Sequence, residues 1–247
     1  MIPKKIHYCW FGRNPLPQMA VDCIESWKKY GPDYEIIEWN EDNFDINSNQ
    51  YAKEAYENKK WAFVSDYARL FALYNHGGVY MDTDMEVLQN LDRFLEHRAF
   101  SGFQSIGEIC TGIIATEKGS DWIKLLLGYY DDRSFFKPNG ELDTTVNVAT
   151  VTRMTTEYTN LQMDNTYQET DKDIVIYPQE YFCPFDYINY RNSRLRAKSI
   201  TENTYALHHF MGSWNSKGQK FKKKLLSLAG PRITGLLRKI KRSKKAN

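Results

Sequence analysis

The stretch of the sequence that most constrains the fold consists almost entirely of apolar residues. It runs from Trp61 to His76 and reads WAFVSDYARLFALYNH. A helix of this composition has no polar face to present to water, so we expect it to be buried nearly all round. Gly77 and Gly78 follow, and paired glycines predict the end of the helix. Other elements must cover this helix, and 247 residues suffice for one sizeable α/β domain.

The neighbouring segments predict the elements that cover it. Residues 5–11 alternate as a strand does, residues 18–30 have apolar side chains at helical spacing, and residues 34–39 are β-rich. Strand, helix and strand at this spacing indicate a parallel βαβ start. We therefore expect an α/β fold with a Rossmann-type mixed central sheet flanked by helices. The other expected elements are helices at 50–59, 121–130 and 144–158, strands at 79–81, 99–103 and 112–116, and a polar loop at 161–173.

Two carboxylates, Asp82 and Asp84, directly follow the short strand 79–81. Like charges at the end of a buried strand repel each other and are costly to desolvate, so they need a counter-charge. An Asp-x-Asp at this position offers hard oxygen ligands, which suit Mn²⁺ or Mg²⁺ bound together with a substrate phosphate. The same tripeptide also occurs by chance and caps turns. Loops at strand ends are nevertheless where open α/β sheets bind their ligands.

The apolar helix contains one charged pair, Asp66 and Arg69, three residues apart and hence on one face. One interpretation is a mutual salt bridge, which contributes little and could be replaced by apolar packing. The other is a pair that faces a polar ligand in a functional site. We favour the second, since such a helix otherwise avoids charge.

Cysteine spacing and hydropathy exclude several classes of protein. Cys9, Cys23, Cys110 and Cys183 are scattered, and the absence of any CxxC or Cys–His spacing argues against zinc and predicts buried, reduced thiols. The N-terminal apolar run is too short for a signal peptide, and no stretch approaches the ~20 apolar residues of a spanning helix. We therefore expect a cytoplasmic protein.

Three blocks of the sequence resemble a known family. They are IPKKIHYCWFG near the start, SDYARLFALYNHGGVYMDTD in the middle and TYALHHFMGSW near the end. In this order they resemble DxD glycosyltransferases of the "glycosyltransferase sugar-binding region" family, which is related to yeast α-mannosyltransferases and the large clostridial glucosylating toxins. The resemblance implies a GT-A fold over residues 1–216. It also implies metal-dependent, retaining transfer of a hexose from a UDP-sugar to a glycan or lipid-linked saccharide, in synthesis of a bacterial surface polysaccharide such as a capsule.

The resemblance assigns roles on the donor side of the site. Trp10 matches an aromatic residue that stacks on uracil, although it could instead be a core tryptophan. Asp66 and Arg69 match a pair that contacts the sugar and phosphate of the donor, and Tyr80 matches an aromatic beside the ribose. Asp84 would bind Mn²⁺ (or Mg²⁺) directly, and Asp82 would touch the ribose and the metal through water.

The resemblance also implies a C-terminal flap that closes over the pyrophosphate. Adjacent histidines on a strand point to opposite sides, so one of His208 and His209 can face the site as a metal ligand or phosphate donor, and we favour His209. Ser213 and Trp214 would contact the donor. Met211 stands where related proteins often have a small or acidic residue, which leaves the third metal ligand open.

Two residues expected on the acceptor side are Asp143 and Asn147, which could line the sugar. The alternative for Asp143 is a simple N-cap of the helix expected at 144–158. No catalytic nucleophile can be named.

Residues 217–247 form a separate basic tail. They hold 12 of the 33 basic side chains and no acidic one, which leaves 21 basic against 31 acidic side chains in residues 1–216. Apolar residues in the tail recur at helical spacing with basic residues between them, as in a helix that lies on an anionic membrane surface. The alternative is a C-terminal helix docked on the body of the protein. We expect peripheral association with the inner face of the membrane.

Two other functions are compatible with parts of the sequence. In a phosphohydrolase of the haloacid-dehalogenase type, the DxD would follow the first strand, whereas here it stands at residue 82. Nucleic-acid binding through the tail is disfavoured by the acidic body and by the lack of a nucleic-acid-binding motif. Partners are thus expected to be a UDP-sugar, a saccharide acceptor and a membrane surface, but no nucleic acid.

Overall fold

The computed structural model describes residues 1–185 and 198–212. The strands are β1 (Lys5–Cys9), β2 (Glu35–Trp39), β3 (Gly78–Met81), β4 (Met85–Val87), β5 (Ala99–Ser105), β6 (Glu108–Ile109), β7 (Ile113–Thr116), β8 (Gln168–Glu169), β9 (Ile174–Tyr177) and β10 (Ala206–His208). The helices are α1 (Gln18–Tyr30), α2 (Gln50–Glu57), α3 (Trp61–His76), α4 (Asp121–Gly128), α5 (Asn147–Tyr158) and α6 (Gln179–Phe182), with short 3₁₀ turns η1 (Ile46–Ser48) and η2 (Asp92–Phe94).

A mixed eight-stranded sheet forms the centre of the molecule. Its strand order is β2-β1-β3-β7-β5-β9-β8, with β6 paired to β5. The strand pairs β1–β2, β1–β3 and β5–β9 are parallel, whereas β3–β7 and β5–β7 are antiparallel. β4 and β10 pair antiparallel in a separate two-stranded sheet. The parallel βαβ start and the mixed, helix-flanked sheet expected from the sequence are confirmed.

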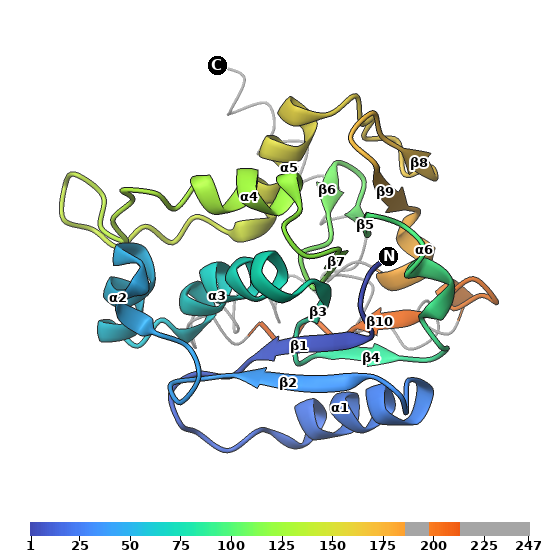
Figure 1. Ribbon diagram of the computed structural model, residues 1–247, viewed down its shortest axis with the longest axis horizontal. Helices are drawn as coiled ribbons and strands as arrows, with labels where there is room; N and C mark the ends of the chain where they lie inside the picture. The colour runs from blue at the N-terminus through green and yellow to red at the C-terminus, as the bar shows by residue number, and fades with distance from the viewer. Residues whose placement is uncertain (186–197, 213–247) are drawn as a thin grey trace, which may run out of the picture.

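The central sheet separates two hydrophobic clusters, one on each face. α1 packs on one face, where Ile24 and Trp27 join Tyr8 of β1, while α2, α3 and α4 cover the other face (Figure 1). Successive residues of β3 alternate between them, because side chains of a strand point to opposite faces: Val79 and Met81 lie in the α1 cluster and Tyr80 in the α3 cluster. The middle strands are therefore buried on both sides.

The burial expected for α3 is confirmed for eight of its 16 residues, and most of the others are partly buried. Val64, Ala68, Ala72 and Leu73 are fully buried in the cluster with α2 and α4. The helix ends at Gly77, whose N–H donates to the carbonyl of Leu73. Gly77 has φ +64°, a conformation that glycine adopts without steric cost, and β3 starts at the next residue.

Several elements differ from the expectation. α5 begins at Asn147, because Thr145 donates from its backbone and its hydroxyl to Asp143 and these bonds hold residues 143–145 in a turn. The segment 161–173, expected to be a loop, contains the short strand β8. The sequence analysis also missed β4, β6 and β9, whose pairing depends on distant partners.

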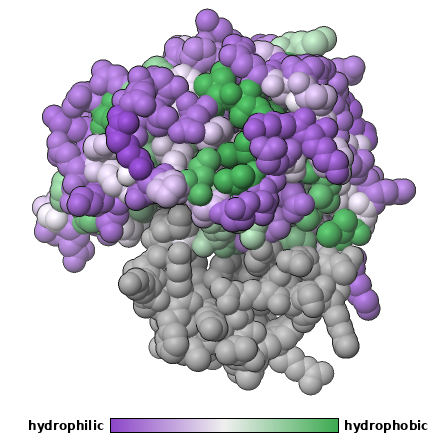
Figure 2. Space-filling view, turned by 90° about the horizontal axis from the view of Figure 1, so that it is seen from below, coloured by the Kyte–Doolittle hydropathy of each residue, from purple (hydrophilic) through white to green (hydrophobic). Residues whose placement is uncertain are grey.

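Hydrophilic residues predominate on the face shown in Figure 2, with small hydrophobic patches between them. Within residues 1–185 and 198–212, no helix is long and apolar enough to span a bilayer. The basic tail 217–247 lies outside the described residues.

Gly77 offers a test of how tightly the turn between α3 and β3 is packed. A Cβ on Gly77 would stand 2.6 Å from the backbone nitrogen of Lys118, whereas a Cβ on Gly119, also at positive φ, would meet nothing within 4 Å. We expect Gly77→Ala to reduce the free energy of unfolding by about 1–3 kcal/mol more than Gly119→Ala, because backbone must move. Urea denaturation measures both, and equal losses would contradict this packing.

Candidate functional site

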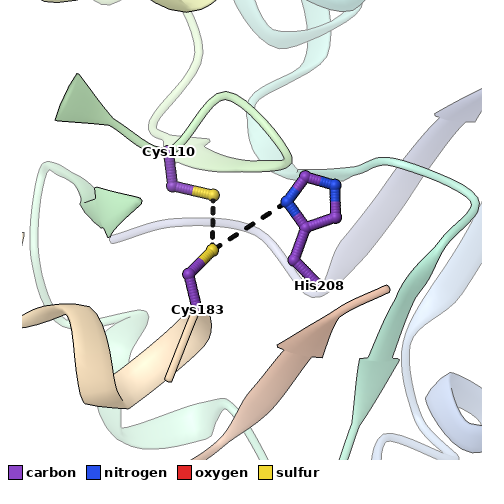
Figure 3. Close-up of side chains that lie close together, drawn as sticks. All are labelled: Cys110, Cys183 and His208. Atoms are coloured by element: carbon purple, nitrogen blue, oxygen red, sulfur yellow. Dashed lines mark hydrogen bonds between the residues drawn. The ribbon is translucent and has the colours of Figure 1, made fainter. Parts of the chain in front are cut away.

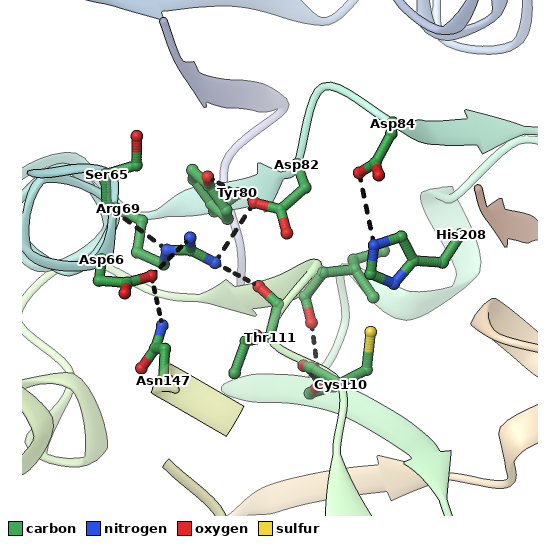
Figure 4. A network of polar contacts seen from close by, with 12 residues as sticks. Ser65, Asp66, Arg69, Tyr80, Asp82, Asp84, Cys110, Thr111, Asn147 and His208 are labelled. Carbon is green, nitrogen blue, oxygen red and sulfur yellow. Dashed lines mark hydrogen bonds and ion pairs between the residues drawn. The ribbon is translucent and has the colours of Figure 1, made fainter. Parts of the chain in front are cut away.

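The Asp-x-Asp segment forms a tight turn between β3 and β4. The N–H of Asp82 donates to the carbonyl of Gly112, and the N–H of Met85 donates back to the carbonyl of Asp82. Both carboxylates therefore stand at the end of a buried strand, held by backbone bonds on either side (Figure 4). Asp84 is buried, and Asp82 is partly exposed.

Asp82, Asp84 and His208 form a cluster whose ligand atoms all lie within 4.8 Å of one another. The Nε2 atom of His208 lies 3.4 Å from Asp84 Oδ1, and the N–H of Met211 donates to Asp84 Oδ2 at 2.7 Å. Burial acts to raise the pKa of Asp84, but His208 and this N–H outweigh it and hold the pKa below its ordinary value. Two carboxylates and an imidazole at this spacing can hold a divalent cation.

His208, rather than His209, faces Asp84, which corrects the placement expected from the sequence. His208 lies opposite Met85 in the register of β10 with β4, and its ring points toward Asp84 (Figure 4). His209 follows the strand, and its Nε2 lies 2.8 Å from Glu86 Oε2, while its N–H donates to the carbonyl of Asp84. The strand register decides between two rings that the sequence cannot distinguish. Ser213 and Trp214, also expected here, lie outside the described residues.

Arg69 connects the buried pair of α3 to the Asp-x-Asp turn. Its guanidinium donates to Asp66 at 2.9 Å and to the carbonyl of Thr111 at 2.8 Å, and lies 3.3 Å from Asp82. It also lies over the ring of Tyr80, whose hydroxyl donates to Asp82. Both interpretations of the pair therefore hold: Arg69 forms a salt bridge with Asp66, and it also lines a cavity at the Asp-x-Asp turn.

Burial shifts the pKa values of the charged groups in this network. It raises the pKa of Asp66 to about 7, although Arg69 acts in the opposite direction. Burial acts to lower the pKa of Arg69, but the neighbouring Asp82, Tyr80 and Asp66 outweigh it and raise that pKa. Arg69 is thus the fixed positive charge of the site.

The two residues expected on the acceptor side have different surroundings. Asn147 lines the cavity, donates its Nδ2 to Asp66, and has a buried Oδ1 with no hydrogen-bond partner among the described residues. Asp143 forms an ion pair with Arg133 and accepts from Thr145, and it is not among the residues that line the cavity. Asp143 is also not the N-cap of α5, since that position is Val146.

A cavity of about 920 Å³ joins these groups. Trp10, half-buried on the loop after β1, lines it and donates its Nε1 to the carbonyl of Asn14. The sequence reading missed Lys59 and Lys60, which line the wall near Trp61, and Thr111, which offers its backbone carbonyl. Lys59 and Lys60 could have been found from the sequence, because two lysines stand directly before the apolar helix. The carbonyl of Thr111 could not, because the sequence does not indicate which backbone groups face a cavity.

Comparison with known proteins agrees with this geometry. Residues 17–101 match the family model described as "Glycosyltransferase sugar-binding region containing DXD motif". The matched segment is similar to the DXD-containing region of those glycosyltransferases. It contains Asp66, Arg69, Asp82 and Asp84, and so includes both the buried pair and the Asp-x-Asp turn.

Relatives of this chain bear glycosyltransferase names. Inositol phosphoceramide mannosyltransferase 3 of Schizosaccharomyces pombe is 28% identical over 126 residues, which cover 49% of this chain and 35% of that protein. This chain thus spans about a third of the length of the yeast relative. An uncharacterized glycosyltransferase, L373, of Acanthamoeba polyphaga mimivirus is 25% identical over 222 residues, or 87% of this chain and 84% of its own length. Among solved structures, the PaToxG glycosyltransferase aligns with 64% of this chain and 70% of its own at 16% identity and a TM-score of 0.48.

The network around Arg69 predicts that substitutions of Arg69 and of Asp66 reduce the free energy of unfolding by different amounts. Arg69→Met should reduce the free energy of unfolding by about 3–5 kcal/mol, because Asp66 and Asp82 then lose the guanidinium that balances their charges. Asp66→Asn should cost about 1 kcal/mol, since an amide oxygen still accepts from Arg69 and Asn147. Urea denaturation at pH 8 compares the two variants. Equal costs would show that Arg69 does not hold the network together.

Proposed function

We propose that this chain transfers a hexose from a UDP-sugar to a glycan or lipid-linked saccharide, with retention of configuration and with a divalent cation, Mn²⁺ or Mg²⁺. The observation that carries the proposal is the cluster of Asp82, Asp84 and His208 on the wall of a cavity of about 920 Å³. That volume lies within the range of ligand pockets. The match of residues 17–101 to a DXD-containing family supports the choice of a nucleotide-sugar.

The donor set fits a hard divalent cation. Asp82 and Asp84 offer carboxylate oxygens, and the charge of a cation would offset their mutual repulsion. His208 Nε2 would complete the set, as a ligand or as a donor to Asp84. When bound with the donor substrate, the cation would stabilise negative charge that develops on the departing diphosphate.

The protein's own groups would position the donor around that cation. Arg69, held by Asp66 and Thr111, keeps a fixed positive charge beside Asp82, where the diphosphate would lie. Trp10 offers an indole at the cavity wall for stacking on uracil, and Tyr80 would lie near the ribose. These groups need little rearrangement on binding, which favours their interaction with charge in the transition state.

Asn147 would contact the transferred sugar. Its buried Oδ1 has no partner among the described residues, and an unsatisfied acceptor in a cavity is relieved by a donor hydroxyl. The name of the yeast relative, a mannosyltransferase that acts on inositol phosphoceramide, supports a lipid-linked acceptor. We place the reaction in synthesis of a bacterial surface polysaccharide.

The basic tail would bring the enzyme to a lipid-linked acceptor. Its 12 Lys and Arg residues, with no acidic residue between 217 and 247, suit an anionic membrane surface on the cytoplasmic side. Residues 1–216 would then form the catalytic domain.

The first test of this function is metal-dependent turnover. The protein is incubated with a panel of UDP-sugars and Mn²⁺, and release of UDP is followed. Asp84→Asn should lower turnover about 100-fold or more, and Asp82→Asn nearly as much, because the cation loses a ligand. EDTA should abolish turnover of the wild type. Asp121→Asn, at an exposed carboxylate on α4, is the matched control and should leave turnover unchanged.

Normal turnover of either site variant without metal would contradict the proposal. Hydrolysis of a simple phosphomonoester in the absence of any turnover of UDP-sugars would favour a phosphohydrolase instead.

Trp10 provides a test of nucleotide binding. Trp10→Ala should weaken binding of UDP several-fold or more, because base–aromatic stacking contributes ~1–3 kcal/mol. Trp122→Phe is the control, since Trp122 is fully buried and bonds to Thr155: it should lower the Tm and leave UDP affinity unchanged. Calorimetric titration and thermal melting measure the two properties. A large fall in Tm with unchanged UDP affinity would make Trp10 a core residue.

The tail is tested by co-sedimentation with anionic liposomes. The full chain should bind them, and less so in high salt, because each basic residue contributes about 1 kcal/mol of electrostatic attraction that salt screens. Truncation after residue 216 should abolish binding and leave release of UDP intact. Persistent binding by the truncated protein would place the membrane contact elsewhere.

A further inference from the structure

Two buried thiols and the Nδ1 atom of His208 form a group that the proposed reaction does not use. Cys110 follows β6, Cys183 follows α6, and His208 ends β10. They are far apart in the sequence, but Figure 3 shows the two thiols and the imidazole turned toward one another. Their ligand atoms lie within 4.8 Å of one another. Cys9 and Cys23, the other free thiols, are not part of this group.

The spacing suits a shared ion. The sulfur atoms of Cys110 and Cys183 are 3.1 Å apart, and His208 Nδ1 is 4.0 Å from the sulfur of Cys183. With small side-chain movements, one ion can lie about 2.3 Å from each sulfur and about 2.0 Å from the nitrogen. Two thiolates would neutralise a divalent ion, so a buried complex would have no net charge to desolvate.

The backbone fixes the positions of all three ligands. Cys110 donates its N–H to Gly102 and accepts at its carbonyl from the hydroxyl of Ser101. Cys183 donates its N–H to the carbonyl of Gln179, and His208 is held by the pairing of β10 with β4. Little ordering would be needed when an ion binds, which favours affinity.

A glycine leaves space beside this group. A Cβ on Gly112 would stand 3.3 Å from His208 Nδ1 and 3.2 Å from the sulfur of Met85. Met85 is fully buried on the other side of this space. The donor set consists of two thiols and one imidazole nitrogen, without a carboxylate.

We propose that Cys110, Cys183 and His208 Nδ1 bind one thiophilic metal ion, Zn²⁺ or Cu⁺, at a site separate from the carboxylates of Asp82 and Asp84. Sulfur and imidazole ligands select such ions, whereas carboxylates select Mn²⁺ or Mg²⁺. The two cysteines are 73 positions apart in the sequence, which explains why no metal motif is visible there.

This site would give His208 a specific orientation. A neutral imidazole that binds a metal through one nitrogen commonly donates from the other nitrogen to a carboxylate. Here Nδ1 faces the sulfur atoms and Nε2 lies 3.4 Å from Asp84 (Figure 4). His208 would then orient Asp84, and Asp82 and Asp84 would hold the hard cation by themselves. The soft site does not depend on the proposed transferase activity.

The test uses the full-length wild type, stripped of metal with a chelator and kept reduced. Titration with Zn²⁺ and, separately, with Cu⁺ against a competing chelator should show one tight equivalent for at least one ion. Co²⁺ should give a thiolate-to-metal charge-transfer band. No tight equivalent for either ion would overturn the proposal.

Matched variants locate the ion. Cys110→Ser and Cys183→Ser should each weaken binding of the ion at least about 100-fold, since loss of a group that only hydrogen-bonds to a metal ligand already costs up to that much. Cys23→Ser, another buried cysteine, should retain it, and Asp82→Asn should lose Mn²⁺ binding but keep the soft ion. Should a serine variant fail to fold, Gly112→Ala, which fills the space beside His208, should weaken the same ion.

A thiol count separates metal binding from oxidation. Protein denatured without reductant should show four free thiols. Two free thiols, with Cys110 and Cys183 joined in a disulfide, would overturn the proposal, and so would equal metal affinity in Cys110→Ser and Cys23→Ser.

Discussion

The structure depends on one buried positive charge. Arg69 contacts Asp66, Asp82 and the carbonyl of Thr111, so a single guanidinium joins α3, the Asp-x-Asp turn and the segment after β6. Without it, two carboxylates in a region of low dielectric would lack a counter-charge. The apolar helix α3 carries Arg69 to this position because its other side chains are held in the core. A stable scaffold and a charged cavity therefore arise from the same helix.

A second positive charge would complete the arrangement. Asp84 lies on the far side of Asp82 from Arg69, and its neighbours are His208 and the N–H of Met211. β10 pairs with β4, so residues 206–208 are attached directly to the strand that follows the Asp-x-Asp turn. A cation and a diphosphate bound at this turn would thus contact groups held both by the central sheet and by β10.

Local features of the fold could be predicted from the sequence. The boundaries of α3, the stop at Gly77 and the placement of Asp82 and Asp84 after a strand follow from composition and glycine spacing, and all are confirmed. Features that depend on strand pairing could not. The choice of His208 over His209 is fixed by the register of β10 with β4, more than 100 residues earlier in the chain. The approach of Cys110 to Cys183 likewise needs the tertiary fold. The prediction of buried, reduced thiols is confirmed for all four cysteines.

The claim that most of this account depends on is that Asp82 and Asp84 hold a divalent cation together with the nucleotide. Electron paramagnetic resonance of Mn²⁺ tests it directly, because free and bound ions give different signals. We predict that the wild type binds Mn²⁺ more tightly when UDP is present, and that Asp84→Asn loses this binding while the exposed control Asp121→Asn keeps it. Unchanged, UDP-dependent Mn²⁺ binding by Asp84→Asn would contradict the account.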